Sequence, residues 1–213
     1  HLVRKNLLKL DLHDFFPSIR SPRVRADFRE MGYSRSIAKV LAELCCLRCC
    51  LPQGAPTSPA LSNIIAYPMD KKMMALAGEY GLVYTRYADD LTFSGDYLPK
   101  DEVLVRIHRI IREEGFTMNV KKTRFLSEHK RKIITGVSVS SGKKMTLPKV
   151  KKREIRKNVH YVLTKGLVGH QEHIGSTDPV YLKRLLGSLC YWRSIEPDNR
   201  YVSDSITALK RLM

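Results

Sequence analysis

Three aspartates are the residues of this chain whose type and spacing could do chemistry. Asp89 and Asp90 are adjacent, and Asp11 lies within the short apolar segment 7–12. Adjacent carboxylates repel each other and raise one pKa unless a cation compensates, so the pair favours a bound metal ion. With Asp11 on a neighbouring strand, the three acids would offer the oxygen ligands that Mg²⁺ prefers, and two such ions could serve phosphoryl transfer. The alternative is a plain turn at Asp89 and Asp90 and an exposed strand residue at Asp11.

The segments around these acids are predicted to be strands. Residues 82–86 and 91–93 are strand-like, which places the two adjacent aspartates at the tip of a hairpin. Residues 7–12 fit a further strand, because a short apolar run is interrupted only twice. Residues 133–139 fit another strand, ended by two serines and a glycine.

The helices are predicted from capping residues and from apolar residues at helical spacing. Residues 51–59 contain three prolines and a glycine, which predicts an irregular loop. The predicted helices of the first part of the chain begin at Ser21, at Ser34 or Ser36, at Ser58 and at Lys100 or Asp101.

The sequence changes character near Pro148. Residues 1–147 combine strands and helices, which predicts an α+β domain. Helical patterns fill most of residues 148–213, with breaks near 166–175 and 196–199. We therefore expect a second, mostly helical domain with a basic entry segment.

The chain carries an excess of positive charge. Its 213 residues include 38 Lys and Arg against 21 Asp and Glu, a formal net charge of +17, and 43% are hydrophobic. Residues 121–157 alone hold fourteen Lys or Arg and two Glu. This balance excludes an acidic disordered chain and predicts a polyanion as partner, bound in a salt-dependent way. No run approaches the ~18 apolar residues that cross a bilayer, and the first residues lack a secretory pattern, so we expect a cytoplasmic protein.

Four cysteines are packed into residues 45–50. Cys46 and Cys49 have CxxC spacing, but no second CxxC and no HxxxH follows to complete a zinc site. Members of the run also stand four apart, as on one face of a helix, so we expect reduced, buried helix cysteines. Cys190 and Trp192 are expected in a core, although the Trp192 ring could also stack on a base.

Four ordered motifs resemble those of reverse transcriptases. The residues that carry the resemblance are DLHDFFPSI at 11–19, LPQGAPTSPALSN at 51–63, YADD at 87–90 and GFTMNVKKT at 115–123. The first two motifs look most like those of bacterial retron enzymes. Residues 134–136 (Ile-Thr-Gly) are a near match to a Val-Thr-Gly triplet of retron enzymes.

The resemblance implies the fold of a right-hand polymerase. Residues 1–147 would form the palm, an antiparallel sheet with packed helices and a ferredoxin-like core, together with the remaining fingers elements. Residues 148–213 would form the helical thumb. The resemblance also implies that much of the N-terminal fingers portion is missing from this sequence.

The resemblance implies an RNA-directed DNA polymerase, a nucleotidyltransferase in which a primer 3′-hydroxyl attacks the α-phosphate of a nucleotide. Asp11, Asp89 and Asp90 would be the catalytic residues. Together with the Leu12 carbonyl they would hold two Mg²⁺ ions, with Mn²⁺ as an alternative.

Further residues would contact the nucleotide. Phe16 would lie under the sugar and exclude a 2′-hydroxyl, although plain core packing is the alternative and strand alternation lets only one of Phe15 and Phe16 face inward. Gln53 and Gly54 would line the nucleotide and template base, or else belong to a rigid connector. Lys122 would lie near the pyrophosphate, or else be one basic residue among many.

Nucleic-acid contacts are expected from basic residues, which position phosphates without reading sequence, and from residues beside the acids or in the triplet. These candidates are Arg86, Tyr87, Lys130, Arg131, Lys132, Thr135, Lys149, Lys151, Lys152, Arg153 and Arg156.

The resemblance also implies partners. These would be a structured non-coding RNA that serves as template and primer source, its cDNA, deoxynucleoside triphosphates and an effector protein in anti-phage defence, with no membrane involved. Two alternatives stay open. One is another bacterial reverse transcriptase of the abortive-infection, CRISPR-associated or group II intron type, and the other is a non-catalytic RNA-binding module on the same fold.

Overall fold

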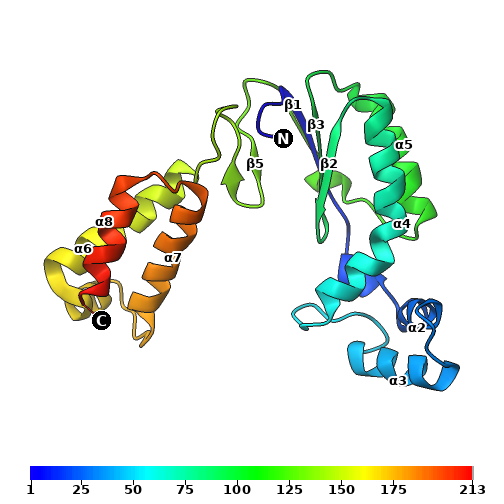
Figure 1. The fold of residues 1–213 in the computed structure, drawn as a ribbon, viewed down its shortest axis with the longest axis horizontal. Coiled ribbons are helices and arrows are strands. Elements are labelled where there is room, and N and C mark those ends of the chain that lie inside the picture. The colour runs from blue at the N-terminus through cyan, green and yellow to red at the C-terminus, as the bar shows by residue number, and fades with distance from the viewer. Residues whose placement is uncertain (213) are drawn as a thin grey trace. The chain divides into compact units, whose positions relative to one another are not determined.

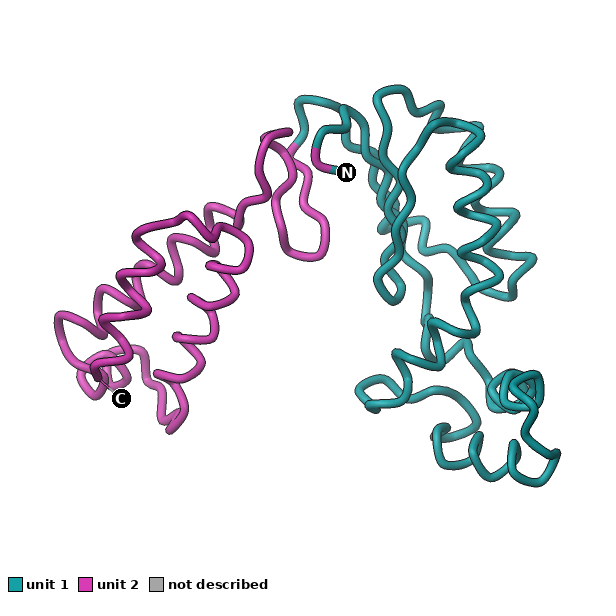
Figure 2. The backbone as a smooth tube through the Cα atoms, in the orientation of Figure 1, with its two compact units in different colours: residues 1, 3–130 teal, residues 2, 131–213 magenta. Residues whose placement is uncertain are grey.

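The computed structural model describes residues 1–212, which form two compact units (Figure 2). One unit contains His1 and Val3–Lys130, and the other contains Leu2 and the residues from Arg131 on. Each unit buries its own hydrophobic cluster, so each is described by itself. Among residues 1–212, none of the helices combines the length and the apolar character that a bilayer span needs.

The first unit is built on a four-stranded antiparallel sheet with the strand order β2-β3-β1-β4. Its strands are β1 (Asn6–Asp11), β2 (Val83–Tyr87), β3 (Asp90–Gly95) and β4 (Arg124–Leu126). β2 and β3 form a hairpin, and β1 lies beside β3 (Figure 1). The predicted strand that carries Asp11 and the predicted hairpin that carries the adjacent aspartates are both confirmed.

The helices of the first unit begin where capping residues predict them. Proline occupies the first turn of the second and fourth helices, where its missing N–H is not needed. Ser34 Oγ accepts a hydrogen bond from the Ile37 N–H at the start of the third helix. The helices are α1 (Phe15–Ser18), α2 (Ser21–Glu30), α3 (Arg35–Cys45), α4 (Ser58–Glu79), α5 (Lys100–Glu113) and the 3-10 turn η1 (Val120–Lys122).

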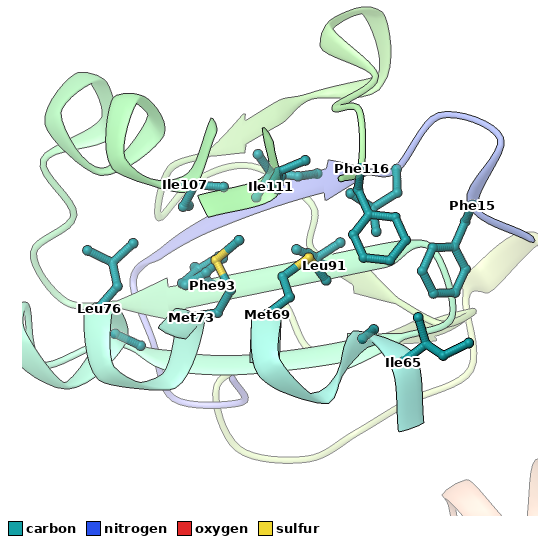
Figure 3. Packing of buried hydrophobic residues seen from close by; sticks show 14 of the residues in the cluster. Phe15, Ile65, Met69, Met73, Leu76, Leu91, Phe93, Ile107, Ile111 and Phe116 are labelled. Atoms are coloured by element: carbon teal, nitrogen blue, oxygen red, sulfur yellow. The ribbon is translucent and has the colours of Figure 1, made fainter. Parts of the chain in front are cut away.

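Helices α4 and α5 pack on one face of the sheet and bury the core of this unit (Figure 3). Met69 and Met73 from α4, Ile107 from α5 and Phe93 from β3 are all fully buried. Burying a side chain of this size stabilises the fold by about 1.5–3 kcal/mol relative to leaving it exposed. This packing holds β3 in place, and with it the aspartate at its first position.

The cysteine run is not the buried helix face that its spacing predicts. α3 ends at Cys45, and Arg48 and Cys49 have positive φ angles of 50° and 63°. The reversal lets the backbone groups of Leu47 and Cys50 pair with each other, at 2.9 and 3.2 Å. Cys49 is consequently exposed, and all five cysteines of the chain are free thiols. The helix interpretation is wrong because a local hairpin-like pairing ends the helix before the run does.

The second unit consists of a short hairpin and three long helices among the residues described. The single strand predicted over 133–139 is wrong, because Thr135 and Gly136 have positive φ angles of 45° and 83° and reverse the chain. Gly166, with a φ of 76°, interrupts the first helix at a predicted break. The elements are β5 (Ile133–Ile134), β6 (Val137–Ser138), α6 (Lys149–His173), α7 (Tyr181–Ile195) and α8 (Arg200–Lys210).

The helices of the second unit pack around Trp192, which is fully buried, as expected for a core residue. Leu147 belongs to the same cluster, and its backbone N–H donates to Glu196 Oε1 at 2.9 Å. These contacts attach the hairpin segment to the helices. The two units therefore divide before Arg131, ahead of the boundary expected near Pro148.

The buried His170 should make the stability of the second unit depend on pH. Its ring is fully buried, Nε2 lies 2.8 Å from Tyr181 Oη, and Nδ1 finds no partner among the described residues. Burial, with smaller effects from His173 and Lys157, lowers the pKa of His170. The unfolded state therefore takes up the proton first, and stability falls as the pH drops below the unfolded value of about 6.5.

We expect His170→Gln to flatten the dependence of the unfolding temperature on pH between about pH 7.5 and pH 5. The matched control is His160→Gln, because His160 lies exposed on the same helix. Thermal unfolding followed by circular dichroism measures both. An equally steep profile in His170→Gln and in the parent protein would contradict the assignment.

Candidate functional site

Strands β1 and β3 bring two of the three aspartates face to face. The antiparallel register pairs Asp11 directly with Asp90. Asp89 lies in the turn before β3, and its carbonyl accepts a hydrogen bond from the Leu12 N–H at 2.9 Å. Directly opposed residues of neighbouring strands point to the same side of a sheet. Residues that are far apart in the sequence thus meet at one end of the sheet.

Asp11 is held by a lysine and an asparagine from the segment that follows α5. Lys122 Nζ lies 2.9 Å from Asp11 Oδ2, and Asn119 Nδ2 donates to Asp11 Oδ1 at 3.2 Å. The Asn119 N–H also donates to the Asp11 carbonyl at 2.8 Å. The hydrogen bond to Asp11 and its charge, with smaller contributions from Asp89 and Asp90, raise the pKa of Lys122. The ammonium group is therefore charged and neutralises part of the acid site.

A pocket at this end of the sheet adds two cations that sequence reasoning missed. It encloses about 210 Å³, and Asp11, Asp90, Lys122, Lys9 and Arg124 are among its lining residues. The register also pairs Lys9 with Arg124 across β1 and β4. Strand alternation could have found Lys9, because it lies two residues before Asp11 and so on the same side. The pocket therefore presents carboxylates and cations side by side.

The acids suit a divalent cation in charge and in ligand chemistry. Asp11 is 7% exposed and already binds a cation, the ammonium of Lys122. Among residues 1–212, no three His, Cys, Asp or Glu side chains converge into a complete metal site. Mg²⁺ does not require one, because it keeps waters and phosphate oxygens among its ligands. Asp11 and Asp90 could thus hold such an ion together with groups of a bound ligand.

The two phenylalanines after Asp14 have different environments. Residues 15–18 form the helical turn α1 rather than a strand, so the strand-alternation argument does not apply. Phe15 is 3% exposed and packs on Phe116, with ring centroids 5.4 Å apart. Phe16 is only partly buried against the same core. Phe15 is the core residue, whereas Phe16 is partly exposed.

The loop before α4 carries Gln53 and Gly54 on its exposed side. Gly54 has a φ of 92°, a conformation that glycine adopts without strain. The Ser58 hydroxyl donates to the Pro52 carbonyl at 2.6 Å and fastens the loop to the helix. The loop is thus anchored at the helix, with its two candidate residues facing solvent.

Arg86 does not occupy the surface position that a phosphate contact requires. Its side chain is 5% exposed and forms two hydrogen bonds with the Asp70 carboxylate, at 2.8 and 2.6 Å. Burial by itself lowers the pKa of Arg86, but the hydrogen bonds and charge of Asp70 outweigh it and raise the pKa. The predicted phosphate contact is replaced by an internal ion pair. The neighbouring Tyr87 is 71% exposed.

The candidates for nucleic-acid contacts between residues 130 and 156 differ in exposure. Lys132 is 4% exposed, so it is not available for a phosphate. Lys152 lies 2.6 Å from Glu196 Oε1. Although burial acts to raise it, the pKa of Glu196 is lowered to about 2 by its hydrogen bonds, that from Lys152 first. The candidates that remain exposed are Lys130, Arg131, Thr135, Lys149, Lys151, Arg153 and Arg156.

Comparison with known proteins gives consistent matches. Residues 3–162 match the family described as Reverse transcriptase (RNA-dependent DNA polymerase). The Retron Ec86 reverse transcriptase of Escherichia coli is 39% identical over 176 residues, which cover 82% of this chain and 54% of that protein. The Retron Mx65 reverse transcriptase of Myxococcus xanthus is 35% identical over 218 residues, which cover 93% of this chain and 48% of that protein. Among solved structures, a telomerase from Candida albicans matches with a TM-score of 0.48 and 11% identity, over 99% of this chain and 48% of that one.

The chain spans about half the length of these curated relatives. The family match nevertheless includes the whole sheet of the first unit, the three aspartates and the lysine that neutralises them. The α+β architecture with an antiparallel sheet agrees with the palm that the motifs imply. The chain therefore belongs to the reverse transcriptase family, and it is similar to retron enzymes within that family.

Proposed function

We propose that the protein is an RNA-directed DNA polymerase of the retron type, which copies a structured non-coding RNA into single-stranded DNA. The observation that carries this proposal is the pairing of Asp11 with Asp90 beside Lys122. Two carboxylates on neighbouring strands, with a lysine ammonium beside them, suit a metal-assisted phosphoryl transfer. The similarity to two retron reverse transcriptases, at 39% and 35% identity, supports the same activity.

In the proposed reaction, the primer 3′-hydroxyl attacks the α-phosphate of a deoxynucleoside triphosphate and pyrophosphate leaves. Asp11, Asp89, Asp90 and the Leu12 carbonyl would hold two divalent ions, for which we propose Mg²⁺, with Mn²⁺ as a substitute. Such ions supply charge stabilisation for the attacking and the leaving oxygen. The protein itself contributes the rigid strand register that keeps the acids at one end of the sheet.

The cations of the same pocket would receive the triphosphate. Lys122, Lys9 and Arg124 share the pocket with Asp11 and Asp90, so the site offers positive charge next to the acids. A triphosphate carries several negative charges, and cations placed beside it neutralise the charge that builds up on pyrophosphate. We assign Lys122 to this role on its position and its similarity to the family motif.

Phe16, Gln53 and Gly54 would select the nucleotide. Phe16 is partly exposed at the edge of the core, where it could close the space below the sugar C2′. Gln53 and Gly54 lie on the exposed side of the anchored loop, and the absent glycine side chain allows close approach of a base. These three residues would therefore set the preference for deoxynucleotides and hold the incoming base.

The exposed basic residues would hold the nucleic acid. They lie just before the β5–β6 hairpin and on the first turns of α6, and contacts of this kind position phosphates without reading sequence. Tyr87, exposed beside the acids, would contact the primer end. The residues assigned to this role are Tyr87, Lys130, Arg131, Thr135, Lys149, Lys151, Arg153 and Arg156.

The proposal includes a cytoplasmic place of action and a role in anti-phage defence with an effector protein. Five free cysteines, one of them exposed, support a reducing compartment. The defence role and the effector follow from the similarity to retron enzymes alone.

Removing the charge of Asp89 should abolish polymerisation. We expect Asp89→Asn to lower primer extension on an RNA template by about 10²-fold or more, because metal-assisted charge stabilisation contributes several kcal/mol. The assay uses the complete protein with Mg²⁺ and radiolabelled primer. Asp96→Asn is the matched control, since Asp96 lies beyond the other end of β3 and pairs with Arg4. Activity like that of the parent protein in Asp89→Asn would refute the metal assignment.

Shortening Phe16 should weaken the discrimination against ribonucleotides. We expect Phe16→Ala to reduce the ratio of kcat/KM for deoxynucleotides over ribonucleotides by about 10- to 100-fold, the range available to a steric pocket that rejects one hydroxyl. Phe28→Ala is the control, because Phe28 is also partly buried but packs on Tyr33. An unchanged ratio with normal deoxynucleotide incorporation would assign Phe16 to the core alone.

Neutralising the start of α6 should reduce the salt dependence of binding. We expect the double change Lys149→Gln and Arg153→Gln to lower the slope of log affinity against log salt by about 1.8, since each phosphate contact contributes about 0.9 on duplex DNA. Fluorescence anisotropy with an RNA–DNA duplex measures the slope. The exposed Lys39, which pairs with Glu43 on α3, provides the control Lys39→Gln. Equal slopes in all three proteins would contradict the proposed contact.

A further inference from the structure

One arginine of the first unit is buried beneath the turn that carries the adjacent aspartates. Arg86 lies on β2, and its guanidinium binds both oxygens of Asp70 on α4 through Nε and Nη2. The remaining nitrogen, Nη1, donates to the Ala88 carbonyl and to Asn63 Oδ1, each at 3.1 Å. The guanidinium also lies 5.7 Å from the centre of the Phe15 ring. All three guanidinium nitrogens therefore donate hydrogen bonds.

Ala88 has a backbone conformation that needs support. Its φ of 51° lies in the left-handed region, which is sterically unfavourable for a residue with a side chain. This conformation turns the Ala88 carbonyl towards Arg86 and starts the reversal into β3. Asp89 and Asp90 are the next two residues, so the direction of both carboxylates depends on this turn.

We propose that Arg86 is a positioning residue, which fixes the turn at Ala88 through its carbonyl and thereby aims Asp89 and Asp90 at the metal-binding end of the sheet. The inference rests on the proposed function for its consequence in catalysis. The geometry on which it depends is the hydrogen bond from Nη1 to the Ala88 carbonyl and the ion pair with Asp70.

The arrangement requires an arginine rather than another cation. A planar guanidinium can engage a carboxylate with two nitrogens and still present a third to a carbonyl, whereas a lysine ammonium is a point charge on a flexible stem. Tyr84 Oη donates to Asp70 Oδ1 at 2.7 Å and helps to hold that carboxylate. The chain thus uses α4 and β2 together to aim one N–H at one backbone carbonyl.

The test is Arg86→Lys, which keeps the positive charge but loses the planar guanidinium that binds Asp70 and the Ala88 carbonyl at the same time. We expect it to weaken binding of Mn²⁺ to the complete protein by about tenfold, the effect of losing one charge-assisted hydrogen bond that orients the ligands. Electron paramagnetic resonance of free Mn²⁺ measures binding without nucleotide or polymerisation. The variant Asp89→Asn shows how much of the total Mn²⁺ binding is due to the site formed by the three aspartates. Arg106→Lys is the matched control, because Arg106 binds both oxygens of Glu79 and does not touch the turn.

A rescue experiment separates positioning from plain stability. Ala88→Gly removes the conformational cost of the left-handed turn, so we expect it to restore Mn²⁺ binding partly in the Arg86→Lys background. A plain loss of stability would lower the fraction of folded protein and leave Mn²⁺ binding by the folded protein unchanged. Where Arg86→Lys lowers the yield of folded protein, Tyr84→Phe gives a milder test, with an expected loss of about two- to threefold.

The outcomes separate the two proposals. Parent-like Mn²⁺ binding in folded Arg86→Lys, or no rescue by Ala88→Gly, would overturn the positioning role. Weakened binding with rescue supports it even if no variant, nor the parent protein, extends a primer. That last result would instead overturn the proposed polymerase function.

Discussion

The structure of the site depends on the register between β1 and β3. Successive side chains of a strand point to opposite sides of the sheet, so a slip of one residue would carry Asp11 away from Asp90 and turn buried leucines of β1 towards the site. Packing prevents the slip, because α4 and α5 bury Phe93 and Leu91 of β3 on one side. The core of this unit therefore fixes the position of its acids more than any contact among the acids does.

That register creates an electrostatic problem that the segment after α5 solves. Like charges directly opposite each other on neighbouring strands are destabilising. Lys122 and Asn119 offset this by binding Asp11, and Lys9 and Arg124 add positive charge to the same pocket. The basic segment 121–157 is thus not a uniform nucleic-acid-binding surface. Part of it balances acids, Lys132 is buried, Lys152 is partly buried in an ion pair with Glu196, and part faces solvent.

Local patterns predicted the elements well, because caps and periodicity act over a few residues. The starts of α2, α3 and α4, the hairpin of β2 and β3 and the buried Trp192 are all confirmed. One feature that was missed depends on contacts between residues far apart in the sequence. Arg86 turns inward and pairs with Asp70 on α4, and no residue near Arg86 in the sequence indicates that partner. Two further features were missed, the turn at Thr135 and Gly136 and the end of α3 at Cys45. In both places residues with positive φ angles reverse the chain, and the spacing of apolar residues does not indicate such a reversal.

The lysine that balances Asp11 also works as a built-in competitor. A cation tethered to the chain has a high effective concentration at its partner, so an ion from solution must displace it rather than fill a vacant site. Lys122, Lys9 and Arg124 place positive charge beside the acids at this end of the sheet. In the proposed enzyme, Lys122 would leave Asp11 for the triphosphate, so Asp11 would become available to a divalent cation when the nucleotide binds. The metal site would then be complete only when the nucleotide substrate is bound.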